Sequence, residues 1–196
     1  MSVQLDRWTG EFGDQYTQRN IVDWRDRVGA WWTMLKELEL DSVLEVGCNR
    51  GHNLVAIGHL YGQDTMLAGV EPNEEAAKVA QQTGRIHHLA PRLGRPHEDI
   101  DRQFDLVFTC GVLIHVPLLE TTLRRIHQLT QRYLLCIEYF ADQETAVEYR
   151  GFTDMLWKRN WPHEYQSRFP ELKLIRSGFW DKDSGFDDCG WWLWEK

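Results

Sequence analysis

The chain has 196 residues and a formal net charge of −8. This length suits one domain with a substantial core and does not require a second domain. Acidic and basic residues are mixed rather than segregated in blocks. A general nucleic-acid-binding surface is therefore not expected.

The sequence contains neither a basic-apolar leader nor an apolar run long enough to span a membrane, so we expect neither secretion nor membrane insertion. The spacing of the cysteines and histidines points to a cytoplasmic protein without disulfides or a metal site. Cys48, Cys110, Cys136 and Cys189 are widely spaced without a CxxC pair, as is typical of reduced thiols in a cytoplasmic protein. The histidines show no metal-ligand spacing, and we predict no bound metal.

The N-terminal part begins with a polar segment, 1–18, in which isolated aromatic residues and two glycines predict an irregular or loosely helical arm. Apolar residues then recur every three or four positions over about 19–39, which predicts one amphipathic helix. Strands and helices alternate from there onward. The expected order is a strand at 42–47, a helix at 51–61, a strand at 65–70, a helix at 73–82, a weak strand at 85–89, a loop over 90–101, a strand at 104–108, a helix at 117–130 with Pro117 in its first turn, and a strand at 133–140.

A long polar excursion, 141–171, separates these elements from two final runs, 172–180 and 189–195. The turn-forming residues between the two runs predict an antiparallel hairpin. The preceding strand–helix alternation favours an α/β fold, a mostly parallel sheet with helices on both faces. We expect a single domain over 1–196, in which 1–40 form an N-terminal arm and helix and 141–171 a substrate-side insertion.

The first predicted strand carries Glu45 and leads into a GxxxG turn that contains Gly47, Cys48, Asn49 and Gly51. Glycines there permit positive φ and close approach of a ligand, and a helix that starts near Gly51 directs its free N–H groups toward that ligand. A dinucleotide-binding turn would read GxGxxG instead. The carboxylate of Glu45 would repel a phosphate but attract the ammonium and sulfonium groups of S-adenosylmethionine.

The second predicted strand ends in Glu71 and Pro72. A carboxylate at this place can accept hydrogen bonds from both ribose hydroxyls of a nucleoside. Cys110 and Gly111, which follow the fourth strand, complete the cofactor-binding residues that we predict. Each motif by itself is also compatible with an ordinary turn or a helix-entry residue. In this order and spacing, the motifs predict an S-adenosylmethionine site.

With these residues in view, the chain resembles class I S-adenosylmethionine-dependent methyltransferases across nearly its whole length. The resemblance implies a Rossmann-like sheet of seven strands, the last inserted antiparallel beside the fifth. The segments 8–20, 149–151, 156–159 and 191–196 resemble more narrowly the pseudaminic acid biosynthesis-associated methylase family. That resemblance implies an acceptor from nonulosonic-acid sugar pathways, and a more distant similarity to phosphonate O-methyltransferases adds phosphonates. The segment from His87 to Arg95 departs from the usual acid-bearing adenine loop, and the adenine contacts within 85–95 stay open.

Methyl transfer is a direct displacement, which requires above all that the methyl acceptor be aligned with the methyl carbon. His115, just past the fourth strand, is the candidate base for an acceptor that must lose a proton. A hydrogen-bonded structural histidine is the alternative. Tyr16 is the second catalytic candidate, because the N-terminal arm could close over the cofactor and bring Tyr16 to the methionine carboxylate or the methyl acceptor. A simply packed N-terminus is the alternative.

Residues 149–168 contain four basic and two acidic side chains, a local positive excess in an acidic chain. Arginine can bind a carboxylate or phosphonate through two parallel hydrogen bonds, so this excess indicates an anion site. A solvated helix face with ordinary ion pairs is the alternative. The substrate-binding residues that we predict are Tyr16, Arg19, Tyr149, Arg150, Lys158 and Arg159.

The sequence thus predicts a cytoplasmic methyltransferase that uses S-adenosylmethionine, releases S-adenosylhomocysteine and methylates an oxygen of a small, anionic acceptor. We expect neither nucleic acid nor membrane as a partner. A non-catalytic S-adenosylmethionine-binding module is the alternative. Methylation of nucleic acid or protein is a weaker one, because the fourth strand lacks the Asn/Asp-Pro-Pro-aromatic turn typical of exocyclic amine methylation. The methyl acceptor itself, O- against N-methylation and the oligomeric state stay open.

Overall fold

The computed structural model describes residues 3–93 and 100–196. The main strands of the described residues are β1 (Ser42–Val46), β2 (Met66–Val70), β3 (His88–Ala90), β4 (Phe104–Cys110), β5 (Thr130–Glu138), β8 (Lys173–Trp180) and β9 (Cys189–Glu195). The helices are α1 (Val3–Thr9), α2 (Glu11–Arg19), α3 (Val28–Leu35), α4 (His52–Tyr61), α5 (Glu74–Gln82), α6 (Leu119–Leu129) and α7 (Trp161–Gln166). Short 3-10 helices are η1 (Trp24–Arg27), η2 (Leu113–His115) and η3 (Lys182–Ser184), and a small hairpin pairs β6 (Thr145–Ala146) with β7 (Trp157–Lys158).

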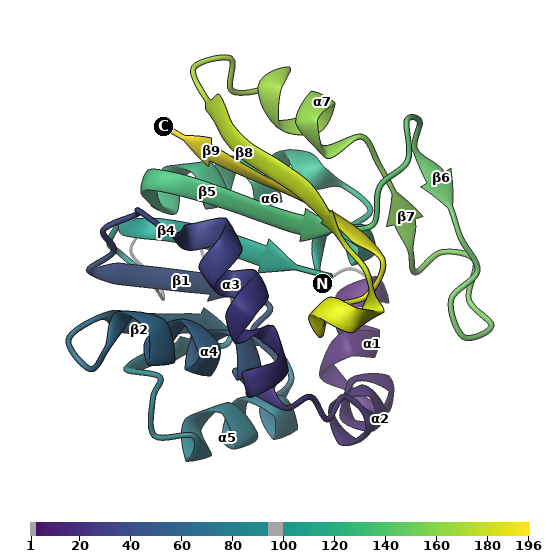
Figure 1. Cartoon of the computed structure of the whole chain (residues 1–196). Coiled ribbons are helices and arrows are strands. Elements are labelled where there is room, and N and C mark those ends of the chain that lie inside the picture. The colour runs from purple at the N-terminus through teal and green to yellow at the C-terminus, as the bar shows by residue number, and fades with distance from the viewer. Residues whose placement is uncertain (1–2, 94–99) are drawn as a thin grey trace.

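Within the described residues, a seven-stranded sheet has the order β3-β2-β1-β4-β5-β9-β8 (Figure 1). Strands β1 to β5 pair in parallel, β9 lies antiparallel beside β5, and β8 pairs antiparallel with β9 at the edge. The predicted Rossmann-like sheet with its antiparallel C-terminal hairpin is confirmed.

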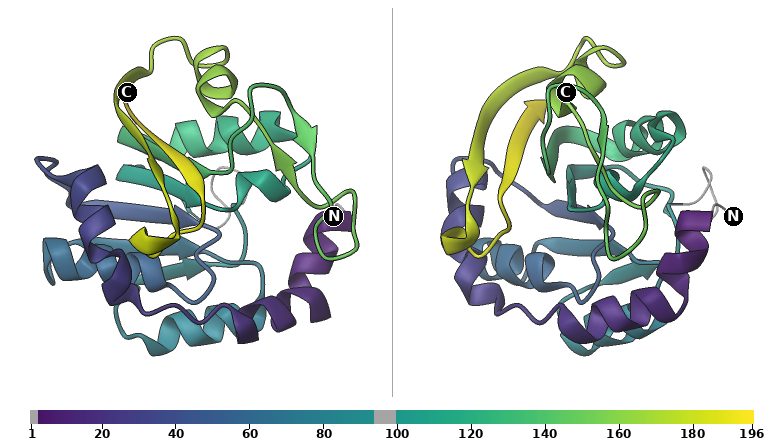
Figure 2. Two further views of the ribbon diagram at one scale, coloured as in Figure 1. Left: turned by 45° about the vertical axis from the view of Figure 1, so that its right-hand side comes forward. Right: turned by 90° about the vertical axis from the view of Figure 1, so that its right-hand side faces the viewer.

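Both faces of the sheet are covered. Neighbouring strand residues such as Val43 and Leu44 are both fully buried but belong to different core clusters, because side chains alternate between the faces of a strand. Helices α3 and α4 pack on one face, and α6 and α7 pack on the other (Figure 2). Because β1 to β5 run in parallel, their carboxyl ends lie at one rim of the sheet, beside α1 and α2 (Figure 1).

The N-terminal segment differs from the prediction. Val3–Thr9 and Glu11–Arg19 form two regular helices where an irregular or loosely helical arm was expected, and the continuous helix expected over 19–39 does not form. The Asp23 side chain accepts a hydrogen bond from the Arg25 backbone N–H and starts a separate helical turn, η1. Ile21, expected on the buried helix face, is 74% exposed. Glu37, with φ of 70°, is in the left-handed region and ends the helical path after α3.

The helix expected over 117–130 was predicted with the wrong start. Helix α6 begins at Leu119, and Pro117 lies before it rather than in its first turn. The chain forms η2 there instead, because the Glu138 carboxylate accepts hydrogen bonds from the backbone N–H groups of residues 112–114. The excursion 141–171 contains the β6–β7 hairpin and α7. Residues 94–99 of the predicted loop 90–101, with Arg95 of the adenine segment, lie outside the described residues.

Candidate active site

A cavity of about 780 Å³ opens at the rim where the parallel strands end. This is the place where open α/β sheets bind ligands, and the volume is in the range of small-molecule sites. The predicted residues that line it are Tyr16, Arg19, Glu45, Gly47, Cys48, Asn49, Glu71, Pro72, Cys110, Gly111, His115, Tyr149 and Arg150. Gly51, Lys158 and Arg159 are not part of its lining.

The turn after β1 owes its shape to two glycines in the left-handed region. Gly47 and Gly51 both have φ of 76°. A Cβ on Gly47 would lie 2.4 Å from Cγ2 of Val112, so a side chain would push the turn and the loop after β4 apart. Gly51 acts at the N-terminus of α4, and a Cβ there would meet Ile86 rather than a ligand. Gly51 therefore shapes the turn without lining the cavity.

Glu45 is buried at the end of β1, with 1% of its surface exposed. Its Oε1 accepts a hydrogen bond of 2.7 Å from Asn53 Nδ2, whereas its Oε2 is buried without a partner among the described residues. Burial raises the pKa of Glu45 to about 8. At that pKa the carboxyl group is mostly protonated at pH 7, and a cationic group of a cofactor beside Oε2 would both supply the missing partner and favour the ionised form.

Arg27 approaches Glu45 from outside the sheet. Its Nη1 donates to Asn53 Oδ1 at 2.8 Å, its Nε donates to the Gly185 carbonyl at 2.8 Å, and its side chain lines the cavity. Asn53 thus connects Arg27 to Glu45, and once an ammonium group has ionised Glu45 the two charges are complementary to the carboxylate and ammonium of an α-amino acid. Sequence reasoning missed Arg27, because it lay inside the helix predicted over 19–39.

Glu71 is also buried, at the end of β2. Its Oε2 accepts from the Asn49 backbone N–H at 2.7 Å and its Oε1 from the Asn73 N–H at 2.8 Å. Burial raises the pKa of Glu71, and these two hydrogen bonds oppose that shift. Each oxygen keeps a further lone pair for a hydroxyl donor. The structure places Glu71 where a ribose contact was predicted, and the contact itself stays a prediction.

His115 ends η2 and is packed against aromatic rings. Its Nδ1 lies 2.5 Å from the Met155 carbonyl oxygen, which can only accept, so Nδ1 carries the proton. Its ring centroid is 4.8 Å from that of Trp8 and 5.3 Å from that of Tyr149. Burial lowers the pKa of His115 to about 4. The imidazole is therefore neutral at pH 7, and Nε2 is the nitrogen that can accept a proton.

Glu138, at the end of β5, is a cavity residue that sequence reasoning did not select. Its Oε1 accepts from the backbone N–H groups of Val112 and Leu113 at 3.1 and 3.0 Å. Burial raises its pKa to about 7. The carboxylate fixes the turn that presents His115. An acid at the end of a buried strand, as in Glu45, was the signal that could have identified it.

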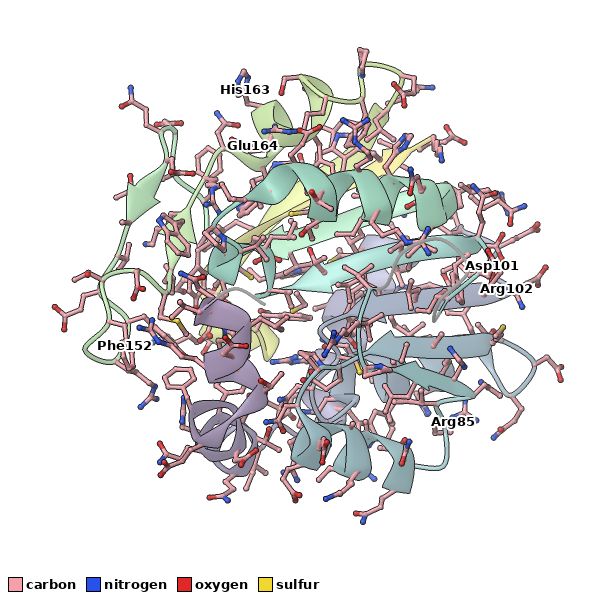
Figure 3. The ribbon with its side chains drawn as sticks, turned by 180° about the vertical axis from the view of Figure 1, so that it is seen from behind. Arg85, Asp101, Arg102, Phe152, His163 and Glu164 are labelled. Atoms are coloured by element: carbon pink, nitrogen blue, oxygen red, sulfur yellow. The ribbon has the colours of Figure 1, made fainter. Side chains whose placement is uncertain are left out.

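The N-terminal helices form an aromatic wall of the cavity. Trp8 and Tyr16 line it with ring centroids 5.2 Å apart, and Phe12 lies 6.1 Å from Tyr149. Phe152 of the same turn as Tyr149 lies beside α1 (Figure 3), with its ring centroid 5.9 Å from that of Phe12. Burial raises the pKa of Tyr16, so its hydroxyl stays protonated at neutral pH and can donate a hydrogen bond. A general-base role for Tyr16 is not favoured.

The predicted positive segment 149–168 does not form one patch. Arg159 is buried, pairs with Glu144 at 2.7 Å and donates to the Leu113 carbonyl, so it has a structural role. Lys158 lies outside the cavity, and Arg168 pairs with Glu164 at 2.7 Å. Arg150 alone of these four cations lines the cavity.

Arg150 is joined at the cavity by Arg19 of α2. The guanidinium carbon of Arg150 lies 5.9 Å from the Tyr149 ring centroid. That of Arg19 lies 5.1 Å from the Tyr16 ring centroid. In the described part of the chain neither guanidinium has a hydrogen bond or ion pair. Arg150 has φ of 51°, an uncommon conformation for a residue other than glycine. These two cations remain available to an anion.

The described part of the molecule contains no group of three His, Cys, Asp or Glu side chains arranged to hold a metal ion. It also contains no helix whose length and apolar character would allow it to cross a membrane.

Comparison with known proteins agrees with this geometry. Residues 44–132, which span β1 to the start of β5, match the family model described as a methyltransferase domain. That stretch, slightly under half of the chain, is similar to a methyltransferase domain. This match agrees with the methyltransferase class that the sequence predicted, but it does not reach the narrower pseudaminic acid-associated family.

Solved structures extend the likeness in fold to the whole chain. Magnesium protoporphyrin IX methyltransferase from Synechocystis PCC 6803, with bound S-adenosylhomocysteine, has a TM-score of 0.69 and 15% identity over 98% of this chain and 97% of its own. A 1,6-didemethyltoxoflavin-N1-methyltransferase from Burkholderia thailandensis has a TM-score of 0.68 and 17% identity over 99% and 87%. An O-methyltransferase from a Brevibacillus brevis trans-AT PKS multienzyme has a TM-score of 0.64 and 11% identity over 100% and 80%. None of the curated proteins compared matches the chain.

Proposed function

We propose that this methyltransferase acts on a small, anionic acceptor and methylates an oxygen atom. The observation that supports the proposal is the pair Arg19 and Arg150, two cations at the cavity that have neither a hydrogen bond nor an ion pair among the described residues. Arginine complements carboxylate and phosphonate groups in both charge and shape. Their availability is unusual in a chain with a net charge of −8, where acids are in excess.

The residues at β1 and β2 fit the amino-acid and ribose parts of S-adenosylmethionine. In this proposal Glu45 binds the α-ammonium through its partnerless Oε2, Arg27 binds the α-carboxylate, and Glu71 binds the ribose hydroxyls. Gly47, Cys48 and Asn49 provide the backbone of the turn. The cofactor supplies an electrophilic methyl group on a sulfonium, so the protein needs chiefly to align the reacting groups and exclude water.

His115 is proposed as the proton acceptor. Its Nδ1–H is fixed by the Met155 carbonyl, which leaves Nε2 to accept the proton of a hydroxyl as the oxygen attacks the methyl carbon. A methyl acceptor that is already an anion at the attacking oxygen needs no base. Tyr16 would then serve as a hydrogen-bond donor that orients either the cofactor or the methyl acceptor.

For the identity of the methyl acceptor we propose a nonulosonic-acid intermediate, a simple carboxylate or a phosphonate, handled in the cytoplasm by one domain. The structurally similar enzymes include both an N1-methyltransferase and an O-methyltransferase. Similarity in fold therefore does not indicate whether this chain methylates nitrogen or oxygen. A non-catalytic S-adenosylmethionine-binding module is the competing function. The negative net charge argues against a nucleic-acid substrate.

Incubation with methyl-labelled S-adenosylmethionine and separate pools of these three compound classes tests the proposal, with mass spectrometry as the readout. We expect label in an anionic product and stoichiometric S-adenosylhomocysteine. Cofactor binding without transfer to any pool would favour the non-catalytic module. Transfer only to an uncharged compound would contradict the proposed role of the two arginines.

A further inference from the structure

Two polar side chains meet at the cavity from segments far apart in the sequence. Tyr139 follows the last residue of β5, and Asp187 lies in the connection between β8 and β9. Both line the cavity. The Tyr139 hydroxyl donates to Asp187 Oδ2 at 2.9 Å. Neither residue belongs to the cofactor-binding or arginine groups described above.

The β8–β9 connection is held in place although Asp187 is exposed. The Gly185 carbonyl accepts from Arg27 Nε at 2.8 Å, and Gly185 has φ of 78°, which turns the chain back toward the sheet. Phe186 is buried, with its ring centroid 5.8 Å from that of Trp31 in the core. The arginine carbon Cζ of Arg27 lies 4.6 Å from the same Phe186 ring. Asp187 is therefore positioned by the two anchored residues that precede it.

The order of the strands indicates whether the Tyr139–Asp187 pair faces the cofactor or the methyl acceptor. The residues proposed for the cofactor lie at the ends of β1 and β2 and, with Cys110 and Gly111, at the end of β4, whereas Tyr139 and Asp187 lie beyond them, beside β5 and β9. In that part of the rim, Glu138 already accepts hydrogen bonds from the backbone of residues 112–114. Asp187 Oδ1 has no hydrogen bond to any residue of the described ranges. Tyr139 and Asp187 thus border the space left for the methyl acceptor.

Both side chains offer lone pairs rather than protons to that space. The Tyr139 proton is engaged with Asp187, and an ionised carboxylate accepts only. Burial and the neighbouring Asp187 carboxylate raise the pKa of Tyr139, so the phenol keeps its proton. The chemistry of this corner is opposite to that of Arg19 and Arg150, which only donate.

We propose that Tyr139 and Asp187 form a second polar anchor of the substrate site, one that binds a hydrogen-bond donor of the methyl acceptor, a hydroxyl or an ammonium group. The inference rests on the proposed function and deepens it. The methyl acceptor then carries two groups, an anion held by the arginines and a donor held by the Tyr139–Asp187 pair. Compounds with an anion alone bind more weakly than compounds with both.

Matched probe pairs test this inference on the full chain saturated with S-adenosylhomocysteine. The pairs are γ-aminobutyrate against butyrate, δ-aminovalerate against valerate, and ε-aminocaproate against caproate, with the ω-hydroxy acids of the same lengths as a second donor series. Dissociation constants come from ligand-detected NMR titration. We expect at least one donor-bearing acid to bind about tenfold more tightly than its plain partner, as a hydrogen bond to a charged group provides.

Asp187→Asn should reduce that preference to about twofold or less, since the amide has lost the charge that strengthens the hydrogen bond. Tyr139→Phe should reduce it in part, because Asp187 loses the hydroxyl that orients it. The neighbouring Asp188 does not line the cavity, and Asp188→Asn should leave the preference unchanged. All three variants should bind S-adenosylhomocysteine like the unmodified chain.

Equal or undetectable binding of every pair to the unmodified chain overturns the inference, as does a preference that survives in Asp187→Asn. Weaker S-adenosylhomocysteine binding in Asp187→Asn also overturns it, because Asp187 would then serve the cofactor. These results differ from failure of the proposed function, in which S-adenosylhomocysteine itself does not bind or no pool receives label.

Discussion

Arg27 provides a direct test of how the cavity holds the amino-acid part of the cofactor. Its Nε donates a hydrogen bond to the Gly185 carbonyl and its Nη1 donates one to Asn53 Oδ1, both at 2.8 Å. Its Nη2 has no hydrogen-bond partner among the described residues. We expect Nη2 to donate to the cofactor carboxylate, since Glu45 at the other side of Asn53 complements the ammonium. A hydrogen bond between charged groups contributes about 1.5 to 3 kcal/mol. Arg27→Met should therefore raise the Kd of S-adenosylhomocysteine roughly 10- to 150-fold.

The assay compares two ligands by isothermal titration calorimetry. S-adenosylhomocysteine carries the amino-acid group, whereas 5′-methylthioadenosine has the same adenosine and sulfur without it. Arg27→Met should leave the Kd of 5′-methylthioadenosine within about twofold of its original value, because that ligand has no carboxylate to lose. The change in the ratio of the two constants isolates the contact from general damage to the cavity.

Arg25→Met is the matched control. Arg25 lies in η1 with Arg27, pairs with the exposed Asp23 at 3.1 Å and does not line the cavity, so its loss should alter neither constant. Equal weakening of both ligands by Arg27→Met would show that Arg27 acts only by holding the β8–β9 connection through Gly185. Unchanged binding of both would show that it does not contact the cofactor. Either result refutes the reasoning.

Three further predictions concern the ribose, the proton and the methyl acceptor. Glu71→Ala should weaken S-adenosylhomocysteine and 5′-methylthioadenosine alike, by about 1 to 3 kcal/mol, since both carry the ribose; calorimetry that finds unchanged affinity removes that role. His115→Gln should abolish transfer only to a methyl acceptor that must lose a proton. With such an acceptor the rate of the unmodified enzyme should fall as pH drops through about 4, where Nε2 becomes protonated, and an acid limb at the ordinary histidine value of 6.5 would contradict this. Arg150→Ala should raise the KM for the methyl acceptor at unchanged cofactor affinity, whereas Arg168→Ala, which removes a cation paired with Glu164 outside the cavity, should not.

The cofactor side of the cavity could be predicted because its parts are close together in the sequence. A strand, a turn and a helix follow one another over Ser42–Val46 and His52–Tyr61, and the turn needs left-handed residues at Gly47, Asn49 and Gly51. Glycine and asparagine tolerate that conformation, so the residue types themselves indicate the backbone path. Glu71 follows from the parallel pairing of β2 with β1, which brings their carboxyl ends to the same rim.

Other features of the site, above all Arg27 and Asp187, could not be predicted, because they depend on tertiary packing. Arg27 reaches the cavity since the cap at Asp23 starts a separate turn, a local event that apolar periodicity hides. Asp187 depends on how the β8–β9 connection folds back onto Phe186. Charge counting failed at Arg159, because composition does not reveal that Glu144 and the Leu113 carbonyl already bind its guanidinium.

Helix α1 covers the cavity with contacts that are weak compared with those of the sheet. α1 has no buried residue, and its ion pair from Arg7 to Asp154 joins side chains that are 27% and 49% exposed. Such a pair contributes about 0 to 1 kcal/mol. Because local opening draws on the least stable segments, we expect α1, and α2 through its direct connection at Gly10, to move when the cofactor exchanges.

Tyr16 and Arg19 would leave the cavity with these helices, whereas Arg150 belongs to the turn that faces them. An anion held by Arg19 and Arg150 together would therefore connect the two sides of the opening. Binding of the methyl acceptor and closure over the cofactor then become coupled, since each stabilises the same arrangement. That coupling is a physical reason why the anion site combines Arg19 and Arg150, which are far apart in the sequence.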